Sequence, residues 1–188
     1  MYNKEYKGDV CSHSHSFFLD NFFRRLIQHP KKIVGEYIKD GDTVIDLGCG
    51  PGYFSIDMAQ MVGNSGKVYS VDLQKKMLET VEKKAEKKCL TDRIMLHNCP
   101  QNKIGLNRDL RADFILAFYM VHETPDPIKF LKEVKTLLKK GGAFLLVEPI
   151  FHVNKKHFHK ITRDIKDIGF TVLDTPKKKG GRSLLLTV

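Results

Sequence analysis

A glycine-rich turn between two short apolar runs restricts the fold of this chain more than any other feature. A β-branched run at 43–45 precedes the turn, and a second apolar run at 68–71 follows it after an amphipathic stretch. Three glycines stand in the turn at alternate positions: Gly48, Gly50 and Gly52. This order predicts a strand–turn–helix–strand unit, in which the turn brings backbone N–H groups close to a ligand at the start of the helix. Glycine suits the turn because a Cβ would block the close approach.

The spacing of the turn and two acidic residues indicate which ligand it binds. A dinucleotide site of the G-x-G-x-x-G type, counted from Gly48, would need a third glycine where this chain has Tyr53. The frame here is D-x-G-x-G-x-G, with Asp46 at its head. Asp72 ends the second apolar run, where a carboxylate can accept hydrogen bonds from ribose hydroxyls. Over about residues 38–188 the chain resembles the class I S-adenosylmethionine (SAM)-dependent methyltransferases, through their first motif and their acidic motif.

The alternation of strand and helix patterns with short connections predicts a doubly wound α/β fold. The resemblance implies a mostly parallel, Rossmann-like sheet of seven strands whose final strand is antiparallel. After the first unit we expect strands at 93–97, 112–119, 143–147, 170–173 and 183–188, the last two as a hairpin at the sheet edge. We expect helices at 53–62, 74–89, 127–139 and 155–168. Cys89 should be a small core residue, and the glycines at 141–142 should end the third of these helices.

The N-terminal part of the chain should form a helical lid over residues 1–40, ahead of a SAM-binding domain at 41–188. One helix is expected from Ser16, and a second from Pro30 with Ile33, Val34, Tyr37 and Ile38 on one face. Both helices would lie over the edge of the sheet where the strands end, because ligands of open α/β folds bind there. The whole chain is expected to be one structural domain, as a monomer or a homodimer.

Composition limits the class of protein and its partners. The 188 residues carry 32 Lys and Arg against 22 Asp and Glu, a formal net charge of +10. Lysines interleaved with glutamate indicate solvated helix faces. The net positive charge is also compatible with a nucleic-acid partner. No apolar run approaches the ~20 residues of a membrane span, and residues 1–16 lack a signal-peptide core, so we expect a cytoplasmic protein. The cysteines, without CxxC pairing, are expected to be free thiols.

The resemblance implies a set of residues that bind the cofactor, SAM. Asp46 and the glycine turn should face the methionine end, and Asp72 should hold the ribose with Leu73 against the adenine. Many relatives bind the adenine amino group with an Asp after the third strand, but this chain has Asn98 and Cys99 near that place. We expect Cys49 to be a small turn residue rather than a nucleophile. The full cofactor set is Asp46, Gly48, Cys49, Gly50, Gly52, Phe54, Asp72, Leu73, Asn98, Cys99 and Phe118.

Methyl transfer from a sulfonium needs positioning of the reactants, and a general base only where the acceptor must lose a proton. The loop after the fourth strand begins at Phe118 and Tyr119 and by position passes the transferring methyl group. His122 and Glu123 follow in this loop, and Glu148 ends the fifth strand, so the candidate catalytic residues are Tyr119, His122, Glu123 and Glu148. The alternative for this loop is that Glu123 pairs with loop backbone and His122 is exposed or packed.

Residues 11–15 combine Cys11, His13 and His15, which are ligand types for soft or borderline metals and metalloids. No resident metal is predicted, because a short polar segment with histidines is more often loop. We predict instead that this segment and the following aromatic residues contact the acceptor. The candidate substrate-binding residues are Cys11, His13, His15, Phe18 and Phe22.

Together these features predict a SAM-dependent methyltransferase that acts on a small-molecule acceptor. The chain looks nearest to the group that C-methylates ubiquinone and menaquinone precursors. One alternative is an RNA methyltransferase, favoured by the charge and by the stretch PKKKGGR at 176–182 but lacking an N/D-P-P-Y motif after the fourth strand, where the chain reads FYMVHE. The other alternative is a SAM-binding protein without transferase activity.

Overall fold

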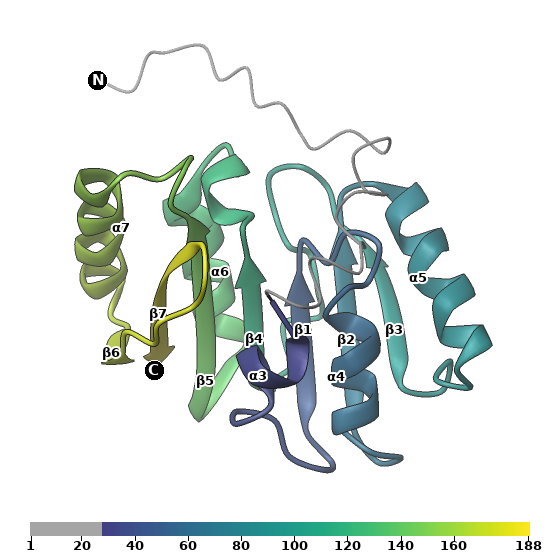
Figure 1. Cartoon of the computed structure of the whole chain (residues 1–188). Helices are drawn as coiled ribbons and strands as arrows, with labels where there is room; N and C mark the ends of the chain where they lie inside the picture. Colours follow the sequence, from purple (N-terminus) through teal and green to yellow (C-terminus); the bar gives the residue numbers. More distant parts are fainter. Residues whose placement is uncertain (1–27) are drawn as a thin grey trace.

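A computed structural model, which describes residues 28–188, has one mixed sheet of seven strands in the order β3-β2-β1-β4-β5-β7-β6 (Figure 1). All neighbouring strands are parallel except β7, which is antiparallel to β5 and β6. The doubly wound fold and the antiparallel hairpin are therefore confirmed. The strands are β1 (Thr43–Leu47), β2 (Lys67–Asp72), β3 (Ile94–Asn98), β4 (Ala112–Phe118), β5 (Leu138–Pro149), β6 (Thr171–Asp174) and β7 (Gly181–Thr187).

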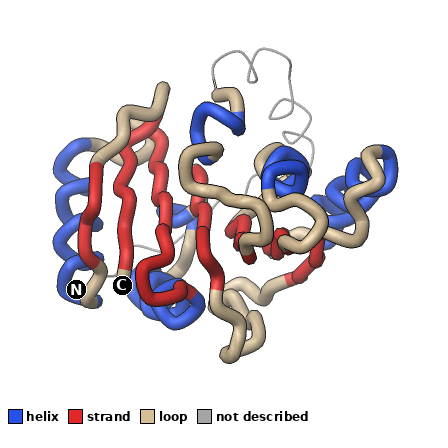
Figure 2. Tube along the Cα trace, turned by 90° about the horizontal axis from the view of Figure 1, so that it is seen from below, coloured by secondary structure: helices blue, strands red, loops and turns tan. Residues whose placement is uncertain are grey.

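Helices cover both faces of the sheet (Figure 2). Buried residues of α3, α4 and α5 form one apolar cluster with one face of the central strands, and those of α6 and α7 form a second cluster with the other face. The helices are α3 (Pro30–Val34), α4 (Ser55–Met61), α5 (Lys75–Lys87), the 3-10 turn η2 (Val121–Glu123), α6 (Pro127–Leu137) and α7 (Lys155–Ile168). No helix among residues 28–188 has the length and apolarity that crossing a membrane requires.

Strand β4 lies in the middle of this three-layer structure and is apolar on both sides. Phe114 and Leu116 belong to the cluster under α3–α5, whereas Ile115 and Ala117 belong to the cluster under α6 and α7. Such a run of consecutive apolar residues is what a central strand covered on both faces requires. Between β1 and β4 the order of the strands reverses, and open α/β sheets bind their ligands at such a point.

The prediction that glycines at 141–142 end the third helix was wrong, because α6 ends at Leu137 and β5 begins at the next residue. Leu138 is already extended and pairs with Ala112, whereas Phe114 pairs with Ala143, so β5 contains a bulge. A Cβ on Gly142 would lie 3.0 Å from three backbone oxygens of this bulge. Gly142 therefore allows the close backbone packing of a bulge, and Gly141 supplies a left-handed φ of 78°, so neither serves as a helix end.

The prediction for Cys89 was also wrong, because its side chain is exposed. Its backbone has a left-handed φ of 53°, and its amide donates to the carbonyl of Glu86 just past the end of α5. This turn directs Leu90 into the core instead, where it is 4% exposed.

The one described part of the expected lid is shorter than predicted and lies elsewhere. Helix α3 ends at Val34 and packs against α4, and Tyr37 stacks on Phe114 with 5.7 Å between the ring centroids. Phe114 lies in the first half of β4, so this segment covers a face of the sheet rather than the edge where the strands end. The helix predicted from Ser16 lies outside the described residues.

Gly52 and Gly141 have similar φ angles but different surroundings. Replacing each with alanine therefore distinguishes the loss of stability caused by overpacking from the loss caused by backbone strain. Gly52 has φ +80° and a Cβ there would lie 2.9 Å from Val81, whereas Gly141 has φ +78° with no atom within 4 Å of the Cβ position. We expect Gly141→Ala to lower the free energy of unfolding by about 1 kcal/mol through strain alone. Gly52→Ala should lower it by about 2–4 kcal/mol, because overpacking adds to the strain. Urea denaturation of both variants measures the difference, and equal losses would contradict this packing.

Candidate functional site

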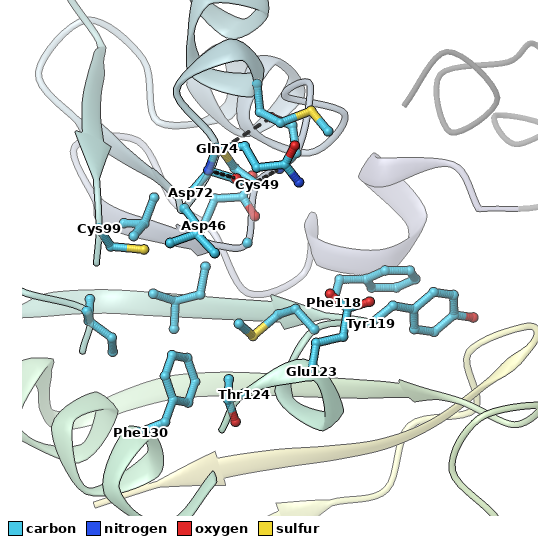
Figure 3. Close-up of a pocket in the computed structure, with 18 of the residues that line it drawn as sticks. Asp46, Cys49, Asp72, Gln74, Cys99, Phe118, Tyr119, Glu123, Thr124 and Phe130 are labelled. Atoms are coloured by element: carbon cyan, nitrogen blue, oxygen red, sulfur yellow. Dashed lines mark hydrogen bonds between the residues drawn. The ribbon is translucent and has the colours of Figure 1, made fainter. Parts of the chain in front are cut away.

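A cavity of about 420 Å³ opens where β1, β2 and β4 end, a size typical of small-molecule sites. Figure 3 shows Asp72, Gln74 and Cys49 on one side of it and Thr124 and Phe130 on the opposite side. Besides Phe130 of α6, its walls come from five chain segments that are far apart in the sequence. These segments are the glycine turn, the end of β2 with the start of α5, the loop after β3, the loop after β4, and the turn after β5.

The glycine turn has the left-handed backbone that its sequence suggests, with φ between 52° and 80° at Gly48, Gly50 and Gly52. A Cβ on Gly48 would lie 2.9 Å from Met120, so the loop after β4 packs directly on this glycine. At Gly50, by contrast, no atom lies within 4 Å of the Cβ position. The turn is thus closely packed at Gly48 and leaves space at Gly50, and both glycines line the cavity.

Asp72 joins the glycine turn to the turn after β2. Its carboxylate accepts hydrogen bonds from the backbone amides of Gly50 and Gln74, each 2.8 Å long. Burial raises the pKa of Asp72, and these two hydrogen bonds oppose the rise. The side chain of Asn98 donates to the carbonyls of Asp72 and Leu73 at 3.0 and 2.9 Å, so Asn98 holds the turn from outside and does not line the cavity.

Asp46 fixes the start of α4 from below the glycine turn. It is 2% exposed, and the hydroxyl of Ser55 donates to its carboxylate at 2.5 Å.

Burial and the charges of Asp46 and Asp72 raise the pKa of the neighbouring Cys49 well above its usual range. Burial, with the charge of Asp72, likewise raises the pKa of Cys99 to about 11. Since the thiolate is the nucleophile, these raised pKa values disfavour a nucleophilic role for either cysteine.

An aromatic group forms the wall between the glycine turn and the loop after β4. The ring of Phe118 lies 4.7 Å from that of Phe54 and 4.2 Å from that of Tyr119. Tyr119 has a left-handed φ of 62°, which is uncommon outside glycine, asparagine and aspartate. Its hydroxyl accepts a hydrogen bond from Gln28 at 3.0 Å and donates to the carbonyl of Lys179 at 3.4 Å. Tyr119 therefore ties the end of β4 to two other segments.

The loop after β3 is held against the cavity by two side chains outside it. The carboxylate of Glu133 on α6 accepts hydrogen bonds from the amides of Ile104 and Gly105 at 2.9 and 2.8 Å. The ring of His97 on β3 pairs with the carbonyl of Ile104 at 2.9 Å. These contacts fix Ile104, which is 1% exposed and lines the cavity.

At the opposite end of the cavity, His122 is paired with a buried carboxylate. Its Nδ1–H donates to Oε2 of Glu148 at 2.5 Å, and its backbone amide donates to Oε1 at 3.1 Å. Glu148 is fully buried and does not line the cavity, whereas His122 does. Burial lowers the pKa of His122, but the hydrogen bond and charge of Glu148 outweigh it and raise the pKa above the usual value. Glu148 is thus a positioning residue for the imidazole.

Two further titratable groups lie beside His122. Oε1 of Glu123 lies 4.0 Å from its Nε2, and the ring of His152 stands edge-on to it with 5.4 Å between centroids. Burial raises the pKa of Glu123, and the positive charge of His122 opposes the rise. His122, Glu123 and His152 therefore form a second ionisable group in the cavity, in addition to the carboxylates of Asp46 and Asp72.

The structure brings most of the predicted site residues together around one cavity. Those that line it are Asp46, Gly48, Cys49, Gly50, Phe54, Asp72, Leu73, Cys99, Phe118, Tyr119, His122 and Glu123. Those that do not are Gly52, Asn98 and Glu148. The predicted substrate residues Cys11, His13, His15, Phe18 and Phe22 lie outside the described residues. Within the described range no group of three His, Cys, Asp or Glu is arranged to hold a metal ion.

Several residues that line the cavity were not predicted from the sequence. Gln74, Met120, Thr124, Phe130 and His152 all line the cavity. His152 follows the end of β5, so the rule that pointed to Glu148 could have found it too. Phe130 lies inside α6 and has no such signal, because only the packing of α6 beside the loop after β4 brings it to the cavity.

A family model described as a methyltransferase domain matches residues 38–178 of the chain. The demethylmenaquinone methyltransferase of Geobacillus sp. (strain WCH70) is 30% identical over 111 residues, which cover 59% of this chain and 47% of that protein. The same-named protein of Lactococcus lactis subsp. lactis (strain IL1403) is 29% identical over 129 residues, 66% of this chain and 50% of that protein. The chain thus spans about half the length of these curated relatives.

Among solved structures, a SAM-dependent methyltransferase from Aquifex aeolicus superposes with a TM-score of 0.83 at 27% identity. The superposition covers 94% of this chain and 99% of that one. The similarity therefore extends over nearly all of a compact protein of this type.

The His122–Glu148 contact predicts how His122 titrates. We expect the imidazole to titrate above the usual value of about 6.5. In Glu148→Gln its pKa should fall, because the burial that lowers it remains while the charge that raises it is gone. Glu123→Gln is the matched control and should lower it less, because Glu123 lies farther away, at 4.0 Å. NMR titration of the ring protons measures all three proteins. An unchanged pKa in Glu148→Gln would contradict the contact.

The same contact predicts a pH-dependent stability. Because the folded-state pKa of His122 lies above the unfolded value, its stabilisation is fully present below about pH 6.5 and is lost as the pH rises through the folded-state pKa. We therefore expect Glu148→Gln to lose more free energy of unfolding at about pH 6 than at about pH 9. Denaturant unfolding at the two pH values measures this, and an equal or reversed loss would exclude the linkage.

Proposed function

Because the chain belongs to the methyltransferase domain family, within the class I SAM-dependent group, we propose that it transfers a methyl group from SAM to a small-molecule acceptor. One observation carries the proposal. A single cavity is lined at one end by the glycine turn and Asp72 and at the other by an imidazole held by a buried carboxylate. The first end has the groups that a nucleoside-containing donor needs, and the second has a group that can take a proton.

The residues around Asp72 fit SAM. The space at Gly50 leaves room for the close approach of a ligand to the backbone, and the adjacent carboxylate can accept hydrogen bonds from ribose hydroxyls. Leu73, Met77 and Ile104 offer apolar surface for an adenine ring. SAM, when bound, supplies an electrophilic methyl group on a sulfonium. The protein's own residues then orient the two reactants and exclude water, which are the main requirements of such a displacement.

His122 is the proposed general base. Because its Nδ1–H is held by Glu148, Nε2 is the nitrogen proposed to take the proton of the acceptor. The buried carboxylate fixes the orientation of the ring and stabilises the imidazolium that forms. Proton transfer to a positioned imidazole is typically worth about 10²–10⁴-fold in rate.

The walls near His122 define the proposed acceptor. Met120, Pro125, Phe130 and Pro149 present mainly apolar surface, and Thr124 adds one hydroxyl. We propose an acceptor with an apolar body and one hydroxyl or acidic C–H, which loses its proton to His122 as the methyl group is transferred. The relatives named demethylmenaquinone methyltransferases support a small-molecule acceptor and add no support to the RNA alternative.

Replacing Asp72 tests the donor site. Asp72→Ala removes the carboxylate for the ribose and the tie to Gly50, so we expect the affinity for SAM to fall about tenfold to hundredfold. Calorimetric titration with SAM measures the change. Asp92→Ala, at an exposed site before β3, is the matched control and should bind SAM normally. Unchanged affinity in Asp72→Ala would exclude the donor site as described.

Replacing His122 tests the transfer step. The wild-type protein, incubated with methyl-labelled SAM and the small-molecule fraction of an extract of its own cells, should produce a labelled small product. His122→Asn should lower this rate about 10²–10⁴-fold and leave the affinity for SAM unchanged. The wild-type rate should rise with pH through the raised pKa of His122, because only the neutral ring accepts a proton.

Three other outcomes of the labelling experiment would contradict the proposal. Label in an RNA fraction would favour the RNA alternative. SAM binding without label in any fraction would favour a non-catalytic protein. Full activity in His122→Asn would exclude His122 as the base.

A further inference from the structure

The turn after β5 exposes two large apolar side chains beside the cavity. Phe151 is 89% exposed and Ile150 is 41% exposed. The residues on either side of this pair, Pro149 and His152, both line the cavity. Exposed apolar side chains at the edge of a binding cavity commonly mark an interaction surface.

A second segment lies against this turn. The amide of Ile150 donates to the carbonyl of Gly180 at 3.1 Å, and the guanidinium of Arg182 donates to the carbonyl of Val153 at 2.8 Å. The connections between β5 and α7 and between β6 and β7 therefore form one surface at the end of the sheet where the cavity opens (Figure 1). We call residues 150–156 and 175–182 the basic rim.

The basic rim is positively charged without internal compensation. Neither of its two segments contains an Asp or Glu, and the absence of acidic residues extends to Arg163. Lys155, Lys156, Lys177 and Lys179 are exposed. Lys178 is used within the fold, because its ammonium donates to the carbonyl of Ile33 and lies 3.5 Å from Glu36. Four exposed lysines therefore belong to the same rim as the apolar pair Ile150 and Phe151.

From this arrangement we propose that the basic rim docks on the surface of a lipid bilayer that contains anionic phospholipid. The lysines would lie among the lipid headgroups, and Phe151 and Ile150 would enter the boundary of the acyl chains. Apolar residues at the tip of a cationic segment are typical of proteins that lie on a membrane interface. Each basic residue near an anionic bilayer adds to the attraction.

Lipid is favoured over nucleic acid by the composition of the rim. Arg182, its one arginine, is only partly exposed, and its guanidinium donates to backbone carbonyls of the neighbouring turn. Arginine carries much of the bidentate recognition of phosphates and bases. The most exposed side chain is instead an aromatic hydrocarbon next to an aliphatic one, which suits insertion into acyl chains.

Docking in this way would turn the opening of the cavity toward the bilayer. An apolar acceptor could then pass from the membrane to the end of the cavity near His122 without crossing water. This consequence rests on the proposed function, but the docking itself does not, so the two can fail separately.

Vesicle flotation tests the docking. The full chain should bind vesicles of phosphatidylglycerol and phosphatidylcholine, bind vesicles of phosphatidylcholine alone much more weakly, and be released by salt. Phe151→Ser and the double variant Lys155→Glu/Lys156→Glu should each weaken binding to the mixed vesicles about tenfold or more. Affinity for SAM in solution should stay normal in both variants, because neither change touches the donor end of the cavity.

Matched controls lie far from the basic rim. Met95→Ser changes an exposed apolar residue on edge strand β3. Lys87→Glu/Lys88→Glu changes two exposed lysines at the C-terminal end of α5. Both should bind the mixed vesicles as the wild type does. Equal loss in these controls, equal binding to both kinds of vesicle, or no vesicle binding by a protein that still binds SAM would overturn the docking. RNA binding by a protein that does not bind vesicles would assign the positive charge to a nucleic-acid partner instead.

Discussion

The hydrogen bond from the amide of Gly50 to the carboxylate of Asp72 joins the ends of two neighbouring strands, and the rest of the site depends on it. Parallel pairing of β1 with β2 brings the glycine turn beside the end of β2. The carboxylate, which also accepts from Gln74, then fixes the backbone of both turns. The shape of the cavity beside Asp72, where the donor is proposed to bind, is therefore set mainly by the backbone of these two turns.

The acceptor end has the opposite character, because it depends on side chains from two strand ends. Glu148 is supplied by β5 and His122 by the turn after β4, and parallel pairing of these strands brings them into contact. The buried carboxylate gives the ring one orientation and one protonated nitrogen. Under the proposed function, this division would let one fold keep its donor site while the residues after β4 and β5 determine the acceptor.

The parts of the molecule that follow local rules could be predicted from the sequence. Alternate glycines and the acidic residues at two strand ends predicted the first unit and Asp72, and the apolar run of β4 predicted a central strand. The start of β5 could not be predicted, because the glycines near it resemble a helix end and only the distant pairing of Leu138 with Ala112 makes them part of a bulge. Glu148 was predicted at the site, but only the packing shows that His122 covers it. Phe130 belongs to a helix, and its place at the cavity follows from tertiary structure alone.

We infer that one cavity holds the donor at Asp72 and directs its reacting atom toward His122. A crystal structure of the complex with S-adenosylhomocysteine tests it most directly. Both ribose hydroxyls should contact the carboxylate of Asp72, and the sulfur should face the part of the cavity lined by His122. A ligand bound elsewhere, or one whose sulfur is separated from His122 by a protein wall, would contradict it.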